Sequence, residues 1–178
     1  MAERLLTTLL EILNYAAELL KRNNISEPRL NAELLLADVL KCKRLELYLD
    51  FDKPLNKQEK DKFKANLRRR LNREPLQYII GNTNFYGYDI VVNESVLIPR
   101  QDTEVLVEIA IESIVQTPEV SAKILEVGVG SGCIAIALVS ELKKRKIPYN
   151  YTGIEISVDA LKIAKLNADI HKLFDEKF

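Results

Sequence analysis

Three glycines stand at alternate positions, Gly128, Gly130 and Gly132, between an apolar run rich in β-branched residues and an apolar helical pattern. This order predicts a strand, a tight loop and a helix whose first backbone N–H groups face a ligand. Glycine accepts positive φ and lets the backbone approach a bound group closely. We therefore predict a loop that binds a nucleoside cofactor, with Gly128, Val129, Gly130, Ser131 and Gly132 as its binding residues.

A further candidate binding residue, Glu155, closes the next strand pattern along the chain. In a strand–helix–strand nucleotide site, an acid at this place accepts hydrogen bonds from both hydroxyls of a ribose. Cys133 stands where the dinucleotide fingerprint G-x-G-x-x-G has its last glycine, which disfavours NAD. Glu126 before the loop gives acid-x-G-x-G-x-G, which is similar to the first motif of the class I methyltransferases and favours S-adenosylmethionine. A packing turn without a ligand is the remaining alternative.

The first part of the chain reads as a small all-helical domain. Apolar residues recur at helical spacing over residues 3–22, and Ser26 is expected to cap a second helix. A short helix follows at about Arg44–Leu49. Asn56 and Glu59 have the spacing of a capping box that opens a further helix.

That last helix is strongly basic and allows two interpretations. A charged run of this kind is most often a solvated helix face. It could instead contact RNA or an acidic protein surface, although the helix has little aromatic interleaving for base stacking. Its basic residues are Lys57, Lys60, Lys62, Lys64, Arg68, Arg69, Arg70 and Arg73.

The second part of the chain combines strands with helices. Residues 84–93 read as two short strands around Gly87, a hairpin. The helix predicted over 102–116 is expected to bury an apolar face. From residue 122 the pattern is strand–helix–strand–helix, which predicts parallel strands joined by a right-handed crossover. The apolar face of the 102–116 helix is expected to contain Val105, Leu106, Ile109, Ile111 and Ile114 or Val115.

Composition narrows the function classes. The 178 residues carry no net charge, although residues 1–75 hold 16 basic and 12 acidic residues and the remainder holds 10 and 14. Two cysteines and one histidine, His171, make a zinc site very unfavourable, and we predict no metal. No apolar run approaches the ~20 residues of a membrane span. We expect a reduced, cytoplasmic protein without membrane contact.

The sequence resembles the glutamine amide methyltransferases that modify peptide chain release factors. The resemblance covers nearly the whole chain, and its most distinctive segment is I-P-R-x-x-T-E, about twenty residues before the glycine loop. The segments that carry it are Glu74–Gly81, Asn84–Gly87, Leu97–Glu104, Ile124–Gly132 and Gly153–Ala160.

The resemblance implies an α-helical N-terminal domain plus a Rossmann-like α/β class I methyltransferase domain that is incomplete at its C-terminal side, joined by a β-hairpin connector. It places the helical, release-factor-recognition domain at 1–74, the connector at 75–101 and the first part of the methyltransferase domain at 102–178. It also implies release factors as partners and a monomer for the full-length protein.

The implied reaction moves the sulfonium methyl group of S-adenosylmethionine to the side-chain amide nitrogen of a glutamine. In the family an Asn-Pro-Pro-Tyr loop accepts the amide hydrogens and positions that nitrogen. This motif is absent from the sequence, so no catalytic residue is assigned and the chain is expected to be inactive by itself. Arg100 and Glu104 belong to the connector motif and are expected near the cofactor, or as capping and ion-pairing residues.

Two alternatives to a release factor methyltransferase stay open. Planar exocyclic amines of nucleic acids are methylated by the same kind of loop, and the basic helix would suit such a substrate. The chain could also be a non-catalytic binding module whose helical domain still recognises a release factor or the ribosome.

Overall fold

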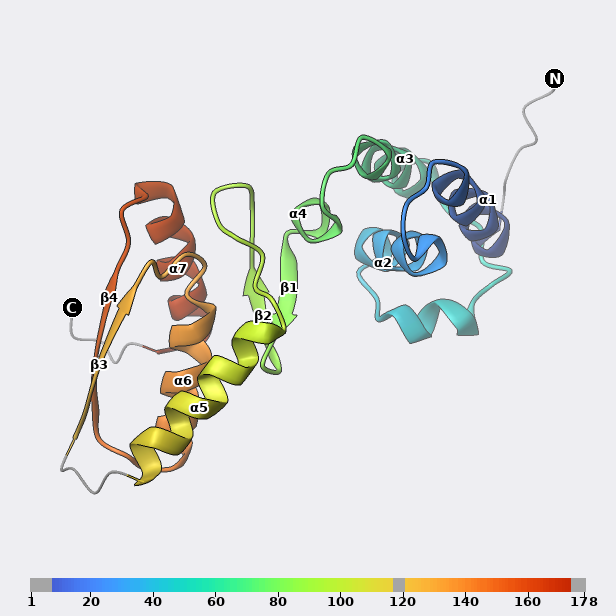
Figure 1. Ribbon diagram of the computed structural model, residues 1–178. Coiled ribbons are helices and arrows are strands. Elements are labelled where there is room, and N and C mark those ends of the chain that lie inside the picture. Colours follow the sequence, from blue (N-terminus) through green and yellow to red (C-terminus); the bar gives the residue numbers. More distant parts are fainter. Residues whose placement is uncertain (1–7, 117–120, 174–178) are drawn as a thin grey trace. The chain divides into compact units, whose positions relative to one another are not determined.

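The computed structural model describes residues 8–116 and 121–173. The chain divides into two compact units, Met1–Ile80 and Gly81–Phe178 (Figure 1). The first is helical and the second combines helices with two small sheets. Within the described ranges, no helix combines the length and the apolar character that crossing a bilayer requires.

The helical unit packs around one apolar core that draws on all of its helices. Leu13 and Leu20 of the first helix and Leu35 of the second are completely shielded from solvent. Leu47 from the short 3-10 helix and Phe63 from the basic helix join the same cluster. The helices are α1 (Leu9–Arg22), α2 (Pro28–Leu40), the 3-10 helix η1 (Arg44–Leu49), α3 (Lys57–Leu71) and α4 (Leu76–Ile80).

Of the two N-terminal caps predicted from the sequence, the cap of α3 is confirmed and the cap of α2 is not. The capping box of α3 is confirmed: the Asn56 side chain accepts from the Glu59 N–H at 2.9 Å, and Glu59 accepts from the Asn56 N–H at 2.8 Å. The expected cap at Ser26 is wrong. Glu27 occupies the N-cap position of α2 in a left-handed conformation with φ of 49°, ahead of Pro28. Ser26 therefore stands one residue too early to cap the helix.

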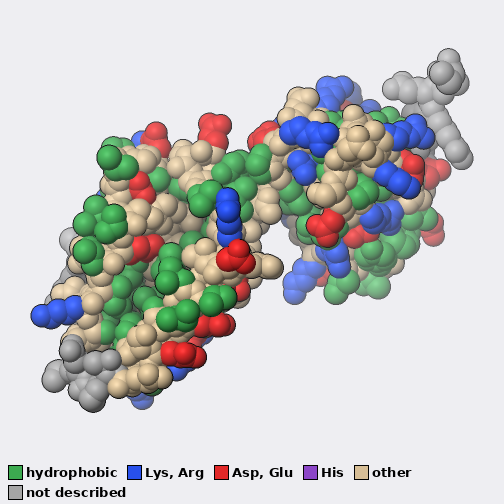
Figure 2. Space-filling model, viewed as in Figure 1, with side chains coloured by type: hydrophobic (Ala, Val, Ile, Leu, Met, Phe, Trp, Pro, Cys, Tyr) green, Lys and Arg blue, Asp and Glu red, His purple; other side chains and the backbone are tan. Residues whose placement is uncertain are grey.

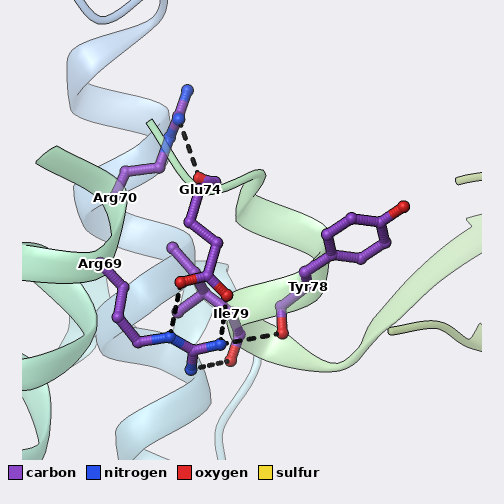
Figure 3. A network of polar contacts seen from close by, with 5 residues as sticks. All are labelled: Arg69, Arg70, Glu74, Tyr78 and Ile79. Carbon is purple, nitrogen blue, oxygen red and sulfur yellow. Dashed lines mark hydrogen bonds and ion pairs between the residues drawn. The ribbon is translucent and has the colours of Figure 1, made fainter. Parts of the chain in front are cut away.

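The basic helix ends in a network of internal contacts, drawn in Figure 3. The Arg69 guanidinium donates to both carboxylate oxygens of Glu74 and, more weakly at 3.5 Å, to the carbonyl oxygens of Tyr78 and Ile79. The Arg70 side chain donates to the Glu74 carbonyl at 3.0 Å. These two arginines hold the end of α3 to α4.

Arg70 also fastens the end of α3 to α2, and Arg73 fastens it to the segment between α1 and α2. Arg70 donates to the Asn31 side chain at 2.7 Å. Arg73 donates to the carbonyl oxygens of Asn23 and Asn24 at 2.8 and 3.0 Å, beyond the end of α1. Three of the eight basic residues thus stabilise the unit itself. Lys57, Lys60, Lys62, Lys64 and Arg68 remain exposed or half-exposed, and Figure 2 shows Lys and Arg side chains spread over this unit.

The second unit begins with the hairpin that the sequence predicted. Its strands pair antiparallel from Asn82 opposite Val91 to Phe85 opposite Tyr88. The two turn residues, Tyr86 and Gly87, both have positive φ, as the tight turns that match strand twist require. The elements of this unit are β1 (Asn82–Phe85), β2 (Tyr88–Val91), α5 (Asp102–Gln116), β3 (Ala122–Val127), α6 (Cys133–Lys144), β4 (Tyr149–Ile154) and α7 (Val158–Ile170).

Strands β3 and β4 are parallel, which confirms the predicted strand–helix–strand unit. Figure 1 shows the helices of this unit on one side of the two strands. Along β3 half-buried and exposed residues alternate, so one face of the sheet packs and the other is open. Leu125 and Val127 on the open face are 62% and 75% exposed.

The expected apolar face of α5 is only partly buried. Val107 and Ile111, four residues apart, form a narrow stripe that is almost fully buried. Val105, Leu106 and Ile109 were expected in the core but are each more than half exposed. α5 contacts chiefly α6, and a single neighbouring helix covers only a narrow stripe of its surface.

Candidate cofactor site

The glycine loop joins β3 to α6, and each of its glycines has positive φ: 81° at Gly128, 57° at Gly130 and 80° at Gly132. A side chain built on Gly128 would meet no atom within 4 Å, and one on Gly130 would meet only the Gly128 carbonyl oxygen at 4.0 Å. The loop backbone at these two residues therefore faces open space. Gly132, the N-cap of α6, lies close to Ala164 of α7.

The end of β4 holds the loop from one side. The Gly128 and Val129 N–H groups donate to the Ile154 carbonyl at 2.7 and 3.2 Å. The Gly130 N–H donates to Glu155 Oε2 at 2.8 Å, and the other carboxylate oxygen of Glu155 accepts from the Ser157 N–H at 2.9 Å. The structure thus brings Glu155 beside the loop, as the sequence predicted for a parallel pair.

These hydrogen bonds determine the charge of Glu155. Backbone N–H donors, Ser157 first and Gly130 next, hold the pKa of the Glu155 carboxyl below its usual range. A carboxylate has about four acceptor sites, and the two backbone donors leave capacity for hydroxyl groups of a ligand. Glu155 is therefore a charged acceptor at the loop at neutral pH.

Glu126, the acid before the loop, has the opposite character. The Tyr151 hydroxyl of β4 donates to Glu126 Oε2, and both residues occupy half-buried positions of their strands. Burial, and secondly the charge of Glu155, raise the pKa of Glu126 to about 7. Desolvation disfavours the carboxylate, and a like charge adds to the effect. The loop thus has one ionised acid and one acid that changes charge near neutral pH.

Gly153 is a site residue that the sequence reasoning missed. A side chain at this position of β4 would lie 2.7 Å from Cγ2 of Val129 in the loop. The loop rests on the strand only because Gly153 has no Cβ. An isolated glycine inside a strand pattern is the signal that could have found it.

The two residues of the connector motif have different places. Glu104 Oε1 accepts from the Tyr86 N–H at 2.7 Å and so fixes the hairpin turn to α5. Arg100 is exposed to solvent. The described contacts therefore favour the structural interpretation of Glu104.

Comparison with known proteins bears on both units. Residues 11–81 match the family described as the PrmC N-terminal domain. A release factor glutamine methyltransferase from Chlorobaculum tepidum is 44% identical over 174 residues, which are 96% of this chain and 58% of that protein. Its counterparts from Geobacter sulfurreducens and Fusobacterium nucleatum are 42% and 38% identical, over 92% and 95% of this chain. The chain is a homologue of the release factor glutamine methyltransferases.

The homology confirms the resemblance read from the sequence motifs and the fold class that it implied. A helical part precedes an α/β segment with parallel strands, as in an incomplete class I methyltransferase. The chain spans about half the length of the curated relatives it matches, with 58%, 55% and 46% of the first three covered. The part that matches contains the glycine loop and Glu155.

The chemistry of the loop fits the cofactor of this methyltransferase family. Open space over Gly128 and Gly130 leaves their backbone accessible to a bound group. At the positive φ of these two positions, a residue with a side chain would be strained. Glu155 adds a charged acceptor of the kind that ribose hydroxyls require. The open loop backbone and Glu155 therefore fit a nucleoside cofactor.

Proposed function

We propose that this homologue carries the cofactor loop and the substrate-recognition domain of an enzyme that methylates the glutamine side-chain amide of peptide chain release factors. The observation that carries the proposal is the pairing of Glu155 with Gly130 at the ends of two parallel strands. The names of its relatives supply the substrate class.

Each residue of the proposed site has a binding task. S-adenosylmethionine supplies a methyl group on a positively charged sulfur. Gly128 and Gly130 leave room for close approach of the cofactor to the loop backbone, while the N–H groups of Gly128, Val129, Gly130 and Gly132 hold the loop in place. Glu155 accepts from the ribose hydroxyls, and Val129 keeps the loop seated on Gly153. The acceptors of the substrate amide would come from an Asn-Pro-Pro-Tyr segment, which the sequence does not contain.

The helical unit would recognise the release factor, in keeping with its match to the PrmC N-terminal domain family. The nucleic-acid alternative receives less support from the structure. Arg69, Arg70 and Arg73 are engaged within the unit, which leaves a weaker basic surface on α3 for phosphates. The proposal implies that the protein acts on the translation termination machinery of the cytoplasm.

Cofactor binding is tested by titration calorimetry of the whole chain with S-adenosylmethionine. We expect E155A to weaken binding by about tenfold or more, since a lost hydrogen bond to a charged group costs about 1.5–3 kcal/mol. D159A removes an exposed acid from the first turn of α7 and is the matched control. Equal affinities of the two variants, or no binding by the unchanged chain, would contradict the proposal.

Methyl transfer is tested with labelled cofactor and a release factor, with and without its acceptor glutamine. We expect no transfer by the 178-residue chain alone. Transfer should begin when a segment that contains Asn-Pro-Pro-Tyr is supplied, either as a continuation of the chain or as a separate fragment. Label on a release factor whose glutamine is replaced by alanine would refute the glutamine as the acceptor.

A further inference from the structure

Asn167 lies on α7 and is completely buried. Its Oδ1 accepts from the Val91 N–H of β2 at 2.8 Å. Its Nδ2 donates to the Val91 carbonyl and to the Ser131 carbonyl of the glycine loop, both at 2.9 Å. Both donors of the amide are thus used on different elements, and the Val91 N–H fixes which end carries the oxygen.

The surface of α7 around Asn167 is shaped to the loop. Ala164 precedes Asn167 by one helical turn and faces the same side of the helix. A Cβ on Gly132 would lie 3.4 Å from the Cα of Ala164, so the helix and the loop are in close contact. Ser131, between the two contacts, is 3% exposed. The small Ala164 admits the loop, and Asn167 binds it.

The hydrogen bond from Asn167 to the loop adds to the hydrogen bonds that the end of β4 makes with the same loop. Ile154 and Glu155 bind the loop through Gly128, Val129 and Gly130, as described above. Asn167 binds its other end, at Ser131, directly before the N-cap of α6. The same side chain binds both backbone groups of one hairpin residue.

We infer that Asn167 is a positioning residue that ties the Ser131 end of the glycine loop to the β1–β2 hairpin, so that a displacement of the hairpin moves the loop. No aliphatic or acidic side chain makes this set of three hydrogen bonds, because the site needs one acceptor and two donors. The inference deepens the proposed function, and its cofactor readout rests on that function.

Hydrogen exchange tests the link without any cofactor. Asn167→Leu keeps the number and branching of the side-chain heavy atoms and removes all three hydrogen bonds. We expect faster exchange at the Val91 amide and at the Gly132 amide, which donates to Val129 within the loop turn. The Val92 amide donates to the Gly81 carbonyl inside the hairpin and should keep its protection.

Asn167→Asp separates the two ends of the link. Its carboxylate can still accept from the Val91 N–H but has no donor for Ser131. We expect the Val91 amide to stay protected while the Gly132 amide exchanges faster, and this difference should shrink at low pH, where a protonated acid regains one donor. If Asn167→Leu or Asn167→Asp fails to fold, Asn167→Ser takes its place, and its amide exchange is compared with that of the remaining variant.

The control for general destabilisation is I111A, which opens the buried stripe of α5. At equal loss of thermal stability, N167L should weaken S-adenosylmethionine binding by about tenfold relative to I111A, since buried carbonyl groups lose their donor. If N167L and I111A have the same Gly132 exchange and the same affinity, Asn167 only fills the core and the inference is overturned. If the unchanged chain binds no cofactor, the proposed function fails and the exchange comparison decides the inference alone.

Discussion

At the scale of residues, the two acids of the loop behave differently because their surroundings differ. Glu155 accepts backbone hydrogen bonds and stays ionised. Glu126 is half-buried, accepts from the Tyr151 hydroxyl, and has a raised pKa. One acid can therefore serve as a permanent acceptor, while the charge of the other depends on pH.

The raised pKa of Glu126 predicts how stability depends on pH. The folded-state pKa of about 7 lies above the ordinary value of 4.5, so the folded state favours the protonated acid. Its contribution is complete below the unfolded pKa and is lost as the pH rises through about 7, at a cost on the order of 1–3 kcal/mol. We expect the α/β unit to melt at a lower temperature at pH 8 than at pH 5.

E126Q should remove most of this pH dependence, because glutamine keeps an acceptor for the Tyr151 hydroxyl and does not ionise between pH 5 and 8. E112Q on α5 changes an exposed glutamate by the same chemistry and is the control. Circular dichroism melts at several pH values provide the measurement. Identical slopes for E126Q and E112Q would show that Glu126 does not carry the effect.

At the scale of elements, the hairpin is fastened to the helices that follow it in the chain. Glu104 of α5 binds the turn at Tyr86. His171 Nε2, just after α7, donates to the Asp89 carbonyl at 2.8 Å. Asn167 binds the same strand one turn earlier on α7. The β1–β2 hairpin is therefore an integral part of the α/β unit.

The end of α3 offers an element-scale prediction. R69A removes the ion pair with Glu74 and the contacts to the α4 carbonyl oxygens, which leaves only the Arg70 hydrogen bond to the Glu74 carbonyl at this end of α3. We expect the helical unit to lose about 1 kcal/mol, because the pair is partly exposed and screened. R68A, the preceding exposed arginine, is the matched control. The measurement is urea unfolding followed by the helical circular dichroism signal. Equal free energies of unfolding for R69A and R68A would show that the network contributes nothing.

At the scale of the whole molecule, the two units differ in how completely they are covered. The helical unit encloses one apolar core. The α/β unit leaves one face of a parallel sheet and part of α5 in contact with water, and Figure 2 shows apolar side chains on its surface. Parallel sheets are normally covered on both faces. The open face, defined by Leu125, Val127 and Ile154, is therefore apolar surface that favours association.

This exposure predicts self-association of the 178-residue chain at high concentration. L125T replaces the 62% exposed leucine at the middle of β3 with a polar residue that suits a strand. We expect it to shift sedimentation velocity profiles toward the monomer. L45T, at a 71% exposed leucine of η1 in the other unit, is the control and should leave association unchanged. A chain that stays monomeric at every concentration would disprove this expectation.

The sequence alone determined the features that depend on local pattern. Glycine spacing, helical periodicity and the capping box at Asn56 are encoded within a few residues, and the hairpin turn needs only positive φ at Tyr86 and Gly87. The parallel pairing of β3 and β4 followed from the strand–helix–strand order. That pairing was enough to bring Glu155 to the loop.

Only the tertiary structure decided contacts between residues far apart in the chain. Asn167 binds Val91 across 76 residues and Ser131 across 36, and no periodicity signals such a bond. The exposed side of α5 likewise depends on which neighbours cover it, while periodicity marks only the apolar positions. The physical reason is that burial and hydrogen-bond partners belong to pairs of elements, whereas sequence patterns describe one element at a time.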